Sequence, residues 1–298
     1  MDVLADFTDV PAFQVTGAER QREPFVFNSP HSGRYYPPRF LAMSRLDATA
    51  IRRSEDSYVD ELFAATAKAG APLLSANFPR AYLDVNREPW ELDPRMFREP
   101  VPSFANIRSS RVAGGLGTIP KLVGEGLDIY ARRLPLSEAL ARIEDIYKPY
   151  HACLAELLLK TRETYGYAVL IDCHSMPGSV RAGDAGNTRP DFIIGDRFGS
   201  SAAAMLTDRA ITLLKSRGYC VVHNKPYAGG FITEHYGRPF EHIHALQIEV
   251  NRSLYMNERT FERLDHFQNL VNDIRDFVEE LTAFANQSFP SVPPIAAE

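Results

Sequence analysis

Residues 168–178 read AVLIDCHSMPG, and this stretch joins a buried apolar run to a turn. The run 168–171 is short and apolar throughout, which is typical of a strand covered on both faces. The Ser-Met-Pro-Gly sequence that follows predicts a turn, so Asp172, Cys173 and His174 fall where the strand ends. Open α/β sheets bind their ligands at that end of their strands. His174 is therefore a candidate functional residue.

A second histidine occurs in a matching context, because FVF at 25–27 leads into NSPHSG at 28–33 and places His31 after a strand. A catalytic zinc typically takes three protein ligands and leaves a fourth position for water. Two histidines at two strand ends therefore predict half of a metal site. The acids of RSEDSYVD, residues 53–60, are candidates for the third ligand. Alternatively, they complement the dipole of a helix or cap it.

Composition restricts the class of protein. The 298 residues include 45% hydrophobic and 24% charged side chains, and the net charge of −5 comes with no basic stripe, so a nucleic-acid partner is not expected. No apolar run approaches the roughly 18–20 residues that cross a bilayer, and the acidic N-terminus is unlike a signal peptide. The three cysteines are odd in number and lack CxxC spacing, which favours a reducing compartment. We expect a cytoplasmic protein without a membrane partner.

The order of elements predicts an α/β fold with three α/β/α layers around a mixed, largely parallel sheet. We expect one domain over 1–298, a functional loop or lid over 88–126 and a loose tail over 288–298. Helices are expected at 48–69, 136–164 (with a kink or break at Pro149), 200–217 and 257–286. Strands are expected at 24–28, 72–76, 81–86, 167–172, 191–195, 219–223 and 244–251.

The strand at 244–251 carries a carboxylate within an apolar pattern. Alternation places Leu246, Ile248 and Val250 on one face and Glu249 on the other. A buried carboxylate is costly unless it is paired or functional. Near a metal, Glu249 could take a proton from water and pass it to a leaving amine, whereas its structural alternative is an ion pair with Arg252.

Arginines surround the short apolar segment 81–86. The planar donor fork of arginine matches a carboxylate, so Arg87 beside Asn86 is a candidate anchor for an acidic substrate. Its structural alternatives are a surface charge or a pair with Asp84. The glycines of YAGGFIT, residues 227–233, let the backbone approach a ligand closely, although a plain tight turn explains them equally.

Seven collinear segments together resemble the N-formylglutamate amidohydrolase family, from about residue 25 to 256. They are SPHSG (29–33), EDSYVDELF (55–63), PRAYLDVNREP (79–89), GLGTIPKL (115–122), DCHSMPG (172–178), NKPYAGGFIT (224–233) and LQIEVNRSLYM (246–256). The resemblance implies a phosphorylase/hydrolase-like α/β fold. It also implies zinc-dependent hydrolysis of N-formyl-L-glutamate to formate and L-glutamate, late in one route of histidine degradation.

The resemblance also implies roles for individual residues. One zinc ion per chain would be held by His31, Asp56 and His174, with Glu55 as the alternative to Asp56 because Ser54 replaces the first acid of the family's pair. Glu249 would be the general base. We further assign Arg80 to the oxyanion, and the acidic N-acyl amino acid to Asn86, Arg87, Tyr227, Gly229, Thr233 and Arg252.

Two other classes of function fit the same residues. One is a different hydrolase on the same scaffold, either an N-acyl-amino-acid deacylase or a carboxypeptidase. The other is a non-catalytic protein that binds a metal or an amino acid.

Overall fold

Seven strands form the main sheet in the computed structural model, which describes residues 3–182 and 188–289. The sheet order is β1-β3-β2-β6-β9-β7-β8. Strands β2, β6 and β9 pair in parallel, β7 is antiparallel to β9, and β8 is parallel to β7. The strands are β1 (Phe13–Thr16), β2 (Phe25–Ser29), β3 (Leu73–Ala76), β6 (Ala168–Met176), β7 (Phe192–Gly195), β8 (Val221–His223) and β9 (Ile243–Asn251). The mixed, mostly parallel sheet predicted from the sequence is confirmed.

Helices connect these strands, and β4 (Leu122–Val123) pairs with β5 (Leu127–Asp128) in a small separate hairpin. Within the described residues, no helix combines the length and the apolar character that crossing a bilayer requires. The α-helices are α1 (Pro38–Met43), α2 (Val59–Leu62), α3 (Ala65–Ala69), α4 (Ser110–Ala113), α5 (Leu136–Arg142), α6 (Lys148–Tyr165), α7 (Ala204–Ser216), α8 (Phe231–Tyr236) and α9 (Phe267–Ser288).

The chain divides into two compact units. The first comprises Met1–Gln14, Pro30–Asp56 and Ser75–Cys153, and the second comprises Val15–Ser29, Ser57–Leu74 and Leu154–Glu298. One domain over 1–298 stays a prediction.

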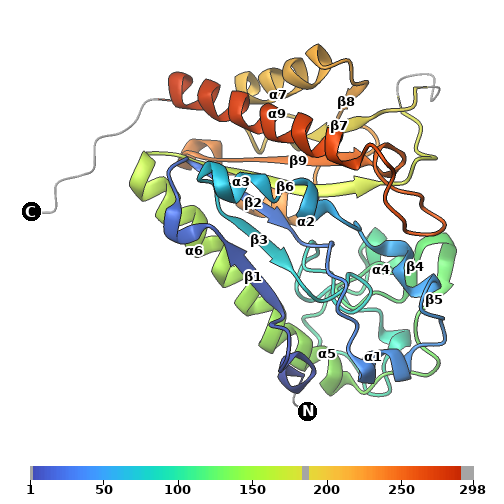
Figure 1. Cartoon of the computed structure of the whole chain (residues 1–298). Helices are drawn as coiled ribbons and strands as arrows, with labels where there is room; N and C mark the ends of the chain where they lie inside the picture. Colours follow the sequence, from blue (N-terminus) through green and yellow to red (C-terminus); the bar gives the residue numbers. More distant parts are fainter. Residues whose placement is uncertain (1–2, 183–187, 290–298) are drawn as a thin grey trace, which may run out of the picture. The chain divides into compact units, whose positions relative to one another are not determined.

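In the second unit, the parity of the strand residues separates a hydrophobic core from a polar face. Val169, Ile171 and Cys173 of β6 pack with Leu246 and Ile248 of β9 in one buried cluster, which α2, α7 and α9 also enter. Figure 1 shows α7 and α9 side by side over this part of the sheet. Each such apolar side chain contributes about 1.5–3 kcal/mol to stability when it is fully buried.

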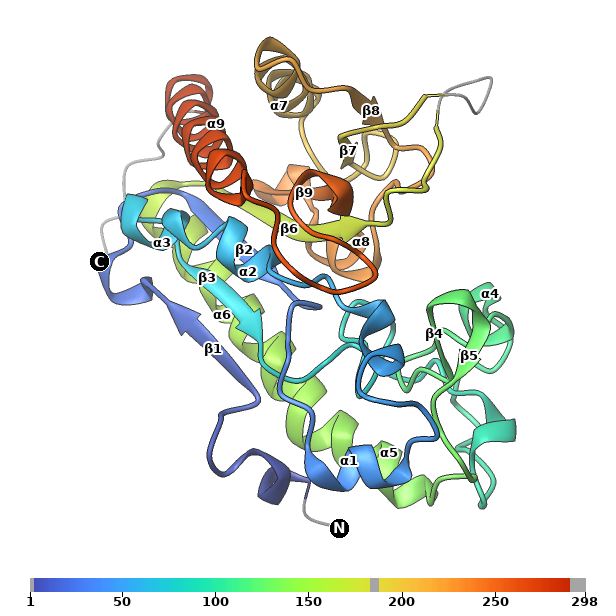
Figure 2. The same cartoon turned by 45° about the vertical axis from the view of Figure 1, so that its right-hand side comes forward.

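The opposite face of the same strands contacts α8. Figure 2 shows β6 and β9 side by side, with α9 and α8 on their two sides. The second unit therefore has helices on both faces of its sheet, as the expected three layers require. Asp172 and His174 of β6 and Gln247 and Glu249 of β9 are on the face that contacts α8.

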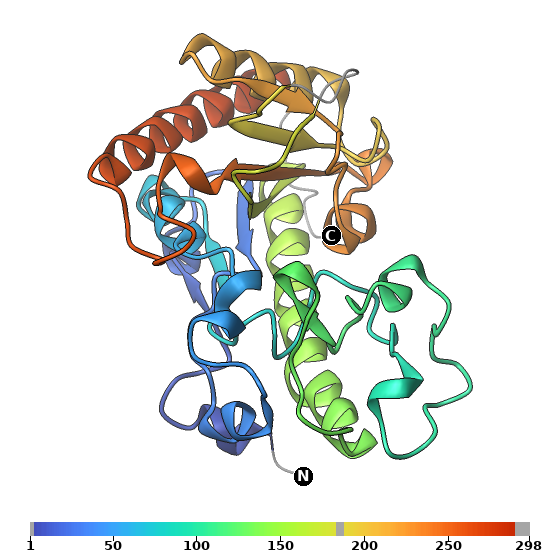
Figure 3. The same cartoon turned by 90° about the vertical axis from the view of Figure 1, so that its right-hand side faces the viewer.

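In the first unit, the segment 88–126 is a long excursion of loops and short elements, drawn in teal to green in Figure 3. It contains 3-10 turns at Pro94–Met96 and Gly124–Gly126, the four-residue helix α4 and the strand β4. Several of its side chains are nevertheless buried, including Leu92, Val112 and Ile119. Its function as a lid stays a prediction.

The prediction of a strand at 81–86 is wrong. Tyr82 and Leu83 donate their backbone N–H groups back to Pro79 at 2.9 and 3.4 Å, which makes a turn. The residues from Ala81 to Asn86 are buried all the same. The apolar run in the sequence correctly indicates that this segment is buried. Burial alone, however, does not distinguish a strand from a packed loop.

The prediction of a single helix at 48–69 is also wrong. This segment forms a 3-10 helix (Ala50–Ser54), followed by α2 and α3. Glu55 is extended, with ψ 142°, and Tyr58 is left-handed, with φ 67°. Neither conformation continues an α-helix.

Two other helix predictions need only their bounds changed. The helix predicted at 136–164 is confirmed as α5, a π-helical turn at Ile143–Tyr147 and α6. Pro149 lies just after the π turn, consistent with its missing N–H group disturbing the regular ladder. The helix predicted at 257–286 begins only at Phe267. Of the tail at 288–298, the part beyond residue 289 lies outside the described residues.

Candidate metal centre

His31 follows β2 on a loop that runs against the backbone of residues 77 and 78. Tyr35 donates its N–H to the Asn77 carbonyl at 3.0 Å. A Cβ atom on Gly33 would lie 2.0 Å from the Phe78 carbonyl oxygen, so only glycine allows this close approach. The SPHSG segment is thereby positioned beside the loop that carries Asp84.

His31 lies between two carboxylates of the first unit, and all three side chains are buried. Its Nε2 lies 2.8 Å from Asp84 Oδ1, and its Nδ1 lies 3.5 Å from Asp56 Oδ2. Because a carboxylate only accepts, the Nε2–H group donates to Asp84, and in the neutral ring the lone pair is then on Nδ1. Donor atoms about 2.0–2.2 Å from a tetrahedral zinc are about 3.3–3.6 Å apart, so the Nδ1–Asp56 separation suits a shared ion.

Asp84 is held by a network of donors. It accepts from Arg80 Nε at 3.0 Å and from the Asn86 N–H at 2.9 Å, and Arg87 lies 3.4 Å away. Burial alone would raise the pKa of Asp84, but the charges of Arg87 and Arg80 and the hydrogen bond from His31 outweigh it and hold that pKa well below its usual range. Asp84 is therefore a permanent anion behind His31.

Arg87, the arginine expected to bind substrate, is buried and already bonded to other groups of the protein. Arg87 donates from Nε to the Leu116 carbonyl at 2.8 Å and from an Nη atom to the Asn86 carbonyl at 2.7 Å, besides its ion pair with Asp84. Burial lowers the pKa of Arg87 to about 10, so the group stays charged at neutral pH. The roles of Asn86 and Arg87 toward substrate, and of Arg80 toward the oxyanion, stay predictions.

In the second unit, His174 lies near the carboxyl end of β6. The strand continues to Met176, four residues beyond its predicted end, so His174 lies within the strand rather than after it. Its Nε2 is 3.0 Å from Asp172 Oδ2. The Asn28 amide donates to the other oxygen of Asp172 at 2.8 Å, and the Thr233 hydroxyl is 3.5 Å from Asp172 Oδ2.

Glu249 is the residue of β9 directly opposite His174 in the parallel register. Register partners on adjacent strands point to the same face, so both side chains lie on the α8 side of the sheet. Glu249 accepts from Gln247 Nε2 at 2.8 Å, and Gln247 Oε1 accepts from the Gly230 N–H at 2.7 Å. This chain of hydrogen bonds fixes the carboxylate to the glycine turn before α8.

The remaining predicted substrate residues surround this face. Gly229 has φ +119°, which favours glycine, and its carbonyl accepts from Arg197 at 3.3 Å. Arg252 donates from Nε to the Ser175 hydroxyl at 3.0 Å. Tyr227 is half-buried in the same turn. Contact of Tyr227, Gly229, Thr233 and Arg252 with a substrate stays a prediction.

His31, Asp56 and His174 form a group that could hold a metal ion. Each offers one ligand atom, and these atoms all lie within 4.8 Å of one another. Glu55 instead accepts from Arg52 at 2.9 Å and from the Tyr36 hydroxyl at 2.7 Å. The sequence patterns singled out the two histidines, and the family resemblance singled out Asp56, but neither identified the carboxylates behind the histidines. Asp172 lies two residues before His174 in the quoted motif, which was the available signal, whereas no sequence signal connected Asp84 with His31.

His242 and His244 form another pair of histidines, at the start of β9, and His244 has a different environment from the candidate metal ligands. His244 Nδ1 accepts from the Ala203 N–H at 3.2 Å, and burial lowers the pKa of His244 to about 4. A neutral acceptor of a backbone hydrogen bond fits a structural role.

Comparison with known proteins identifies the family of this chain. The profile of the N-formylglutamate amidohydrolase family matches residues 23–256. The chain belongs to this family. It is 29% identical to the N-formylglutamate deformylase of Pseudomonas aeruginosa over 281 residues, which is 93% of this chain and 99% of that protein. The N-formylglutamate deformylase of Pseudomonas putida is 29% identical over 248 residues, covering 82% of this chain and 86% of that protein.

Solved structures give the same result. The N-formylglutamate amidohydrolase of Ralstonia eutropha JMP134 superimposes with a TM-score of 0.86 at 32% identity, over 93% of this chain and 99% of that one. The gene product Atu2144 of Agrobacterium tumefaciens, at 19% identity and a TM-score of 0.67 over 96% of this chain and 97% of that one, shares the fold.

Proposed function

We propose that this protein hydrolyses N-formyl-L-glutamate to formate and L-glutamate, with one divalent metal ion, zinc, held by His31, Asp56 and His174. The observation that carries the proposal is the placement of Glu249 opposite His174, in a chain whose relatives are named for this reaction. In the cell, the reaction would complete one route of histidine degradation in the cytoplasm.

The donor set suits zinc chemistry. Two histidines and one carboxylate are a common catalytic zinc set. His31 and His174 each turn Nε2 toward a carboxylate, an arrangement that fixes the ring and raises the basicity of the other nitrogen. When bound, the metal supplies Lewis acidity and lowers the pKa of water from about 15.7 towards about 7.

Glu249 would move the proton. Its carboxylate accepts a proton from the attacking water, whose oxygen bonds to the formyl carbon. As the C–N bond breaks, Glu249 returns that proton to the amine nitrogen, which leaves as glutamate. Gln247 holds the carboxylate in place during both transfers through its hydrogen bond to Oε1.

Substrate choice would depend on the amino-acid part, because formyl is the smallest acyl group. Asn86 and Arg87, on the loop that follows β3, are our candidates for binding that part, while Arg80 on the same loop is our candidate for the oxyanion. A panel of N-formyl, N-acetyl and N-succinyl amino acids tests this choice. Faster turnover of an acetyl or succinyl substrate would replace the proposed reaction by a related deacylase activity.

The direct test is Glu249→Gln, assayed by formate release and by metal content. We expect activity to fall by about 10²–10⁴-fold while metal content stays near that of the unchanged protein. Glu280→Gln, at a half-exposed position on α9, is the matched control and should leave both quantities unchanged. Loss of metal from Glu249→Gln would make Glu249 a ligand, and unchanged activity would exclude it as the base.

A further inference from the structure

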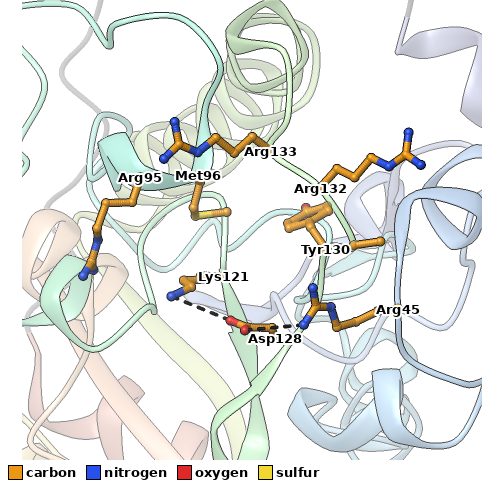
Figure 4. Close-up of a pocket in the computed structure, with 9 residues that line it drawn as sticks. Arg45, Arg95, Met96, Lys121, Asp128, Tyr130, Arg132 and Arg133 are labelled. Atoms are coloured by element: carbon orange, nitrogen blue, oxygen red, sulfur yellow. Dashed lines mark ion pairs between the residues drawn. The ribbon is translucent and has the colours of Figure 1, made fainter.

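A separate cavity lies in the first unit, against the β4–β5 hairpin. Its volume is about 210 Å³. Figure 4 shows its lining, which is dominated by cationic side chains. The lining residues are Arg45, Arg95, Met96, Lys121, Asp128, Tyr130, Ala131, Arg132 and Arg133.

Backbone hydrogen bonds fix the walls of this cavity. Arg45 donates its N–H to the Ile129 carbonyl at 2.9 Å, and Ile129 donates to the Lys121 carbonyl at 2.8 Å. On another wall, Leu134 donates to the Met96 carbonyl at 2.8 Å. The segments that carry the lining residues are thus joined by main-chain hydrogen bonds.

The charge of the lining is strongly one-sided. Five cationic side chains face one carboxylate, in a chain whose net charge is −5. Asp128 lies 3.9 Å from Arg45 and 3.7 Å from Lys121, so a single carboxylate forms ion pairs with two cations. Figure 4 shows both cations directed at this acid.

The other three cations differ in how far they are neutralised. Arg95 makes a close ion pair with its neighbour Asp93 at 2.8 Å. Arg132 and Arg133 are exposed, and within residues 3–182 and 188–289 neither side chain has an ion pair or hydrogen-bond partner. In Figure 4 they extend in opposite directions from the same segment. The two guanidinium groups therefore lie on different sides of the lining.

We propose that this cavity binds a small multivalent oxyanion, a molecule that carries two or more carboxylate or phosphate charges. Guanidinium forks match the geometry of both groups, and Arg132 and Arg133 supply two. The volume is below the roughly 300–1,000 Å³ typical of drug-sized ligands, so the occupant is small. This site does not depend on the metal centre or on the proposed reaction.

Calorimetric titration of the full chain with pyrophosphate and with citrate tests the proposal, and at the same time distinguishes a phosphate ligand from a carboxylate one. We expect one equivalent of at least one anion to bind. The double variant Arg132→Ala/Arg133→Ala should weaken that binding by about tenfold or more, because charge-assisted hydrogen bonds are lost. Formate release should be unchanged in the same variant.

The matched control is Arg20→Ala/Arg275→Ala, which removes the same charge from exposed positions outside the cavity lining. It should retain the affinity of the unchanged protein. Equal weakening by both double variants would mean that net charge alone attracts the anion, and would overturn the proposal. Absence of binding by both anions at low ionic strength would overturn it as well.

Discussion

The two histidines of the candidate metal centre have the same kind of partner but very different supports. His31 and Asp84 lie on loops, and Asp84 is surrounded by Arg80 and Arg87. His174 and Asp172 lie on one strand, and Asp172 is held by the neutral groups of Asn28 and Thr233.

The difference shows two ways to hold a carboxylate behind a ligand. Without a strand to fix it, Asp84 is restrained by charged donors, and their charge offsets the cost of its burial. Asp172 takes its position from the β6 ladder and accepts hydrogen bonds from the neutral groups of Asn28 and Thr233. The loop half of the site should therefore be the more sensitive to loss of charge.

The largest expected effect comes from removing the histidines themselves. His31→Ala and His174→Ala should each lower formate release by at least about 100-fold, because changes to the outer partners of a metal ligand already cost about 10–100-fold. Metal content, measured by mass spectrometry, should fall with activity. Full metal content in either variant would remove that histidine from the ligand set.

The comparison itself is tested by Asp84→Asn and Asp172→Asn, measured by urea unfolding of metal-free protein. Asp84→Asn leaves Arg80 and Arg87 without their buried anion and should cost about 3 kcal/mol of the free energy of unfolding. Asp172→Asn loses hydrogen bonds to neutral donors and should cost about 1 kcal/mol. Equal costs would show that the two supports do not differ in kind.

A smaller effect is expected where neither histidine is touched. Gln247→Leu removes the hydrogen bond to Glu249 and should lower kcat by about tenfold, with metal content unchanged. Because Glu249 also loses a donor to its charged form, its pKa should rise, and the acidic limb of the pH profile of kcat should shift to higher pH. An unchanged pH profile of kcat would leave Gln247 with a purely structural role.

Sequence patterns identified the strand-built half of the site more completely than the loop-built half. The alternation in β9 placed Glu249 opposite the apolar face, and the apolar run of β6 led to His174. Both inferences rest on local periodicity, which side-chain burial imposes directly.

The loop-built half of the site could not be predicted from local periodicity. The segment around Asp84 has the composition of a strand but turns back on itself at Pro79, and the left-handed Tyr58 divides a segment whose apolar spacing resembles a helix. Contacts between residues distant in sequence determine these conformations. The periodicity of the sequence does not reveal such contacts. The family resemblance supplied Asp56, while Asp84 became evident only from its distance to His31.

The parallel register of β6 and β9 restricts how this chain can tolerate insertions. One extra residue directly after Ile243 would exchange the two faces of β9 beyond it, sending Glu249 into the apolar cluster and placing Ile248 opposite His174. Length variation should be tolerated in the irregular excursion at 88–126, where no strand parity has to be kept. Length changes compatible with activity are therefore expected in that excursion and not in β9.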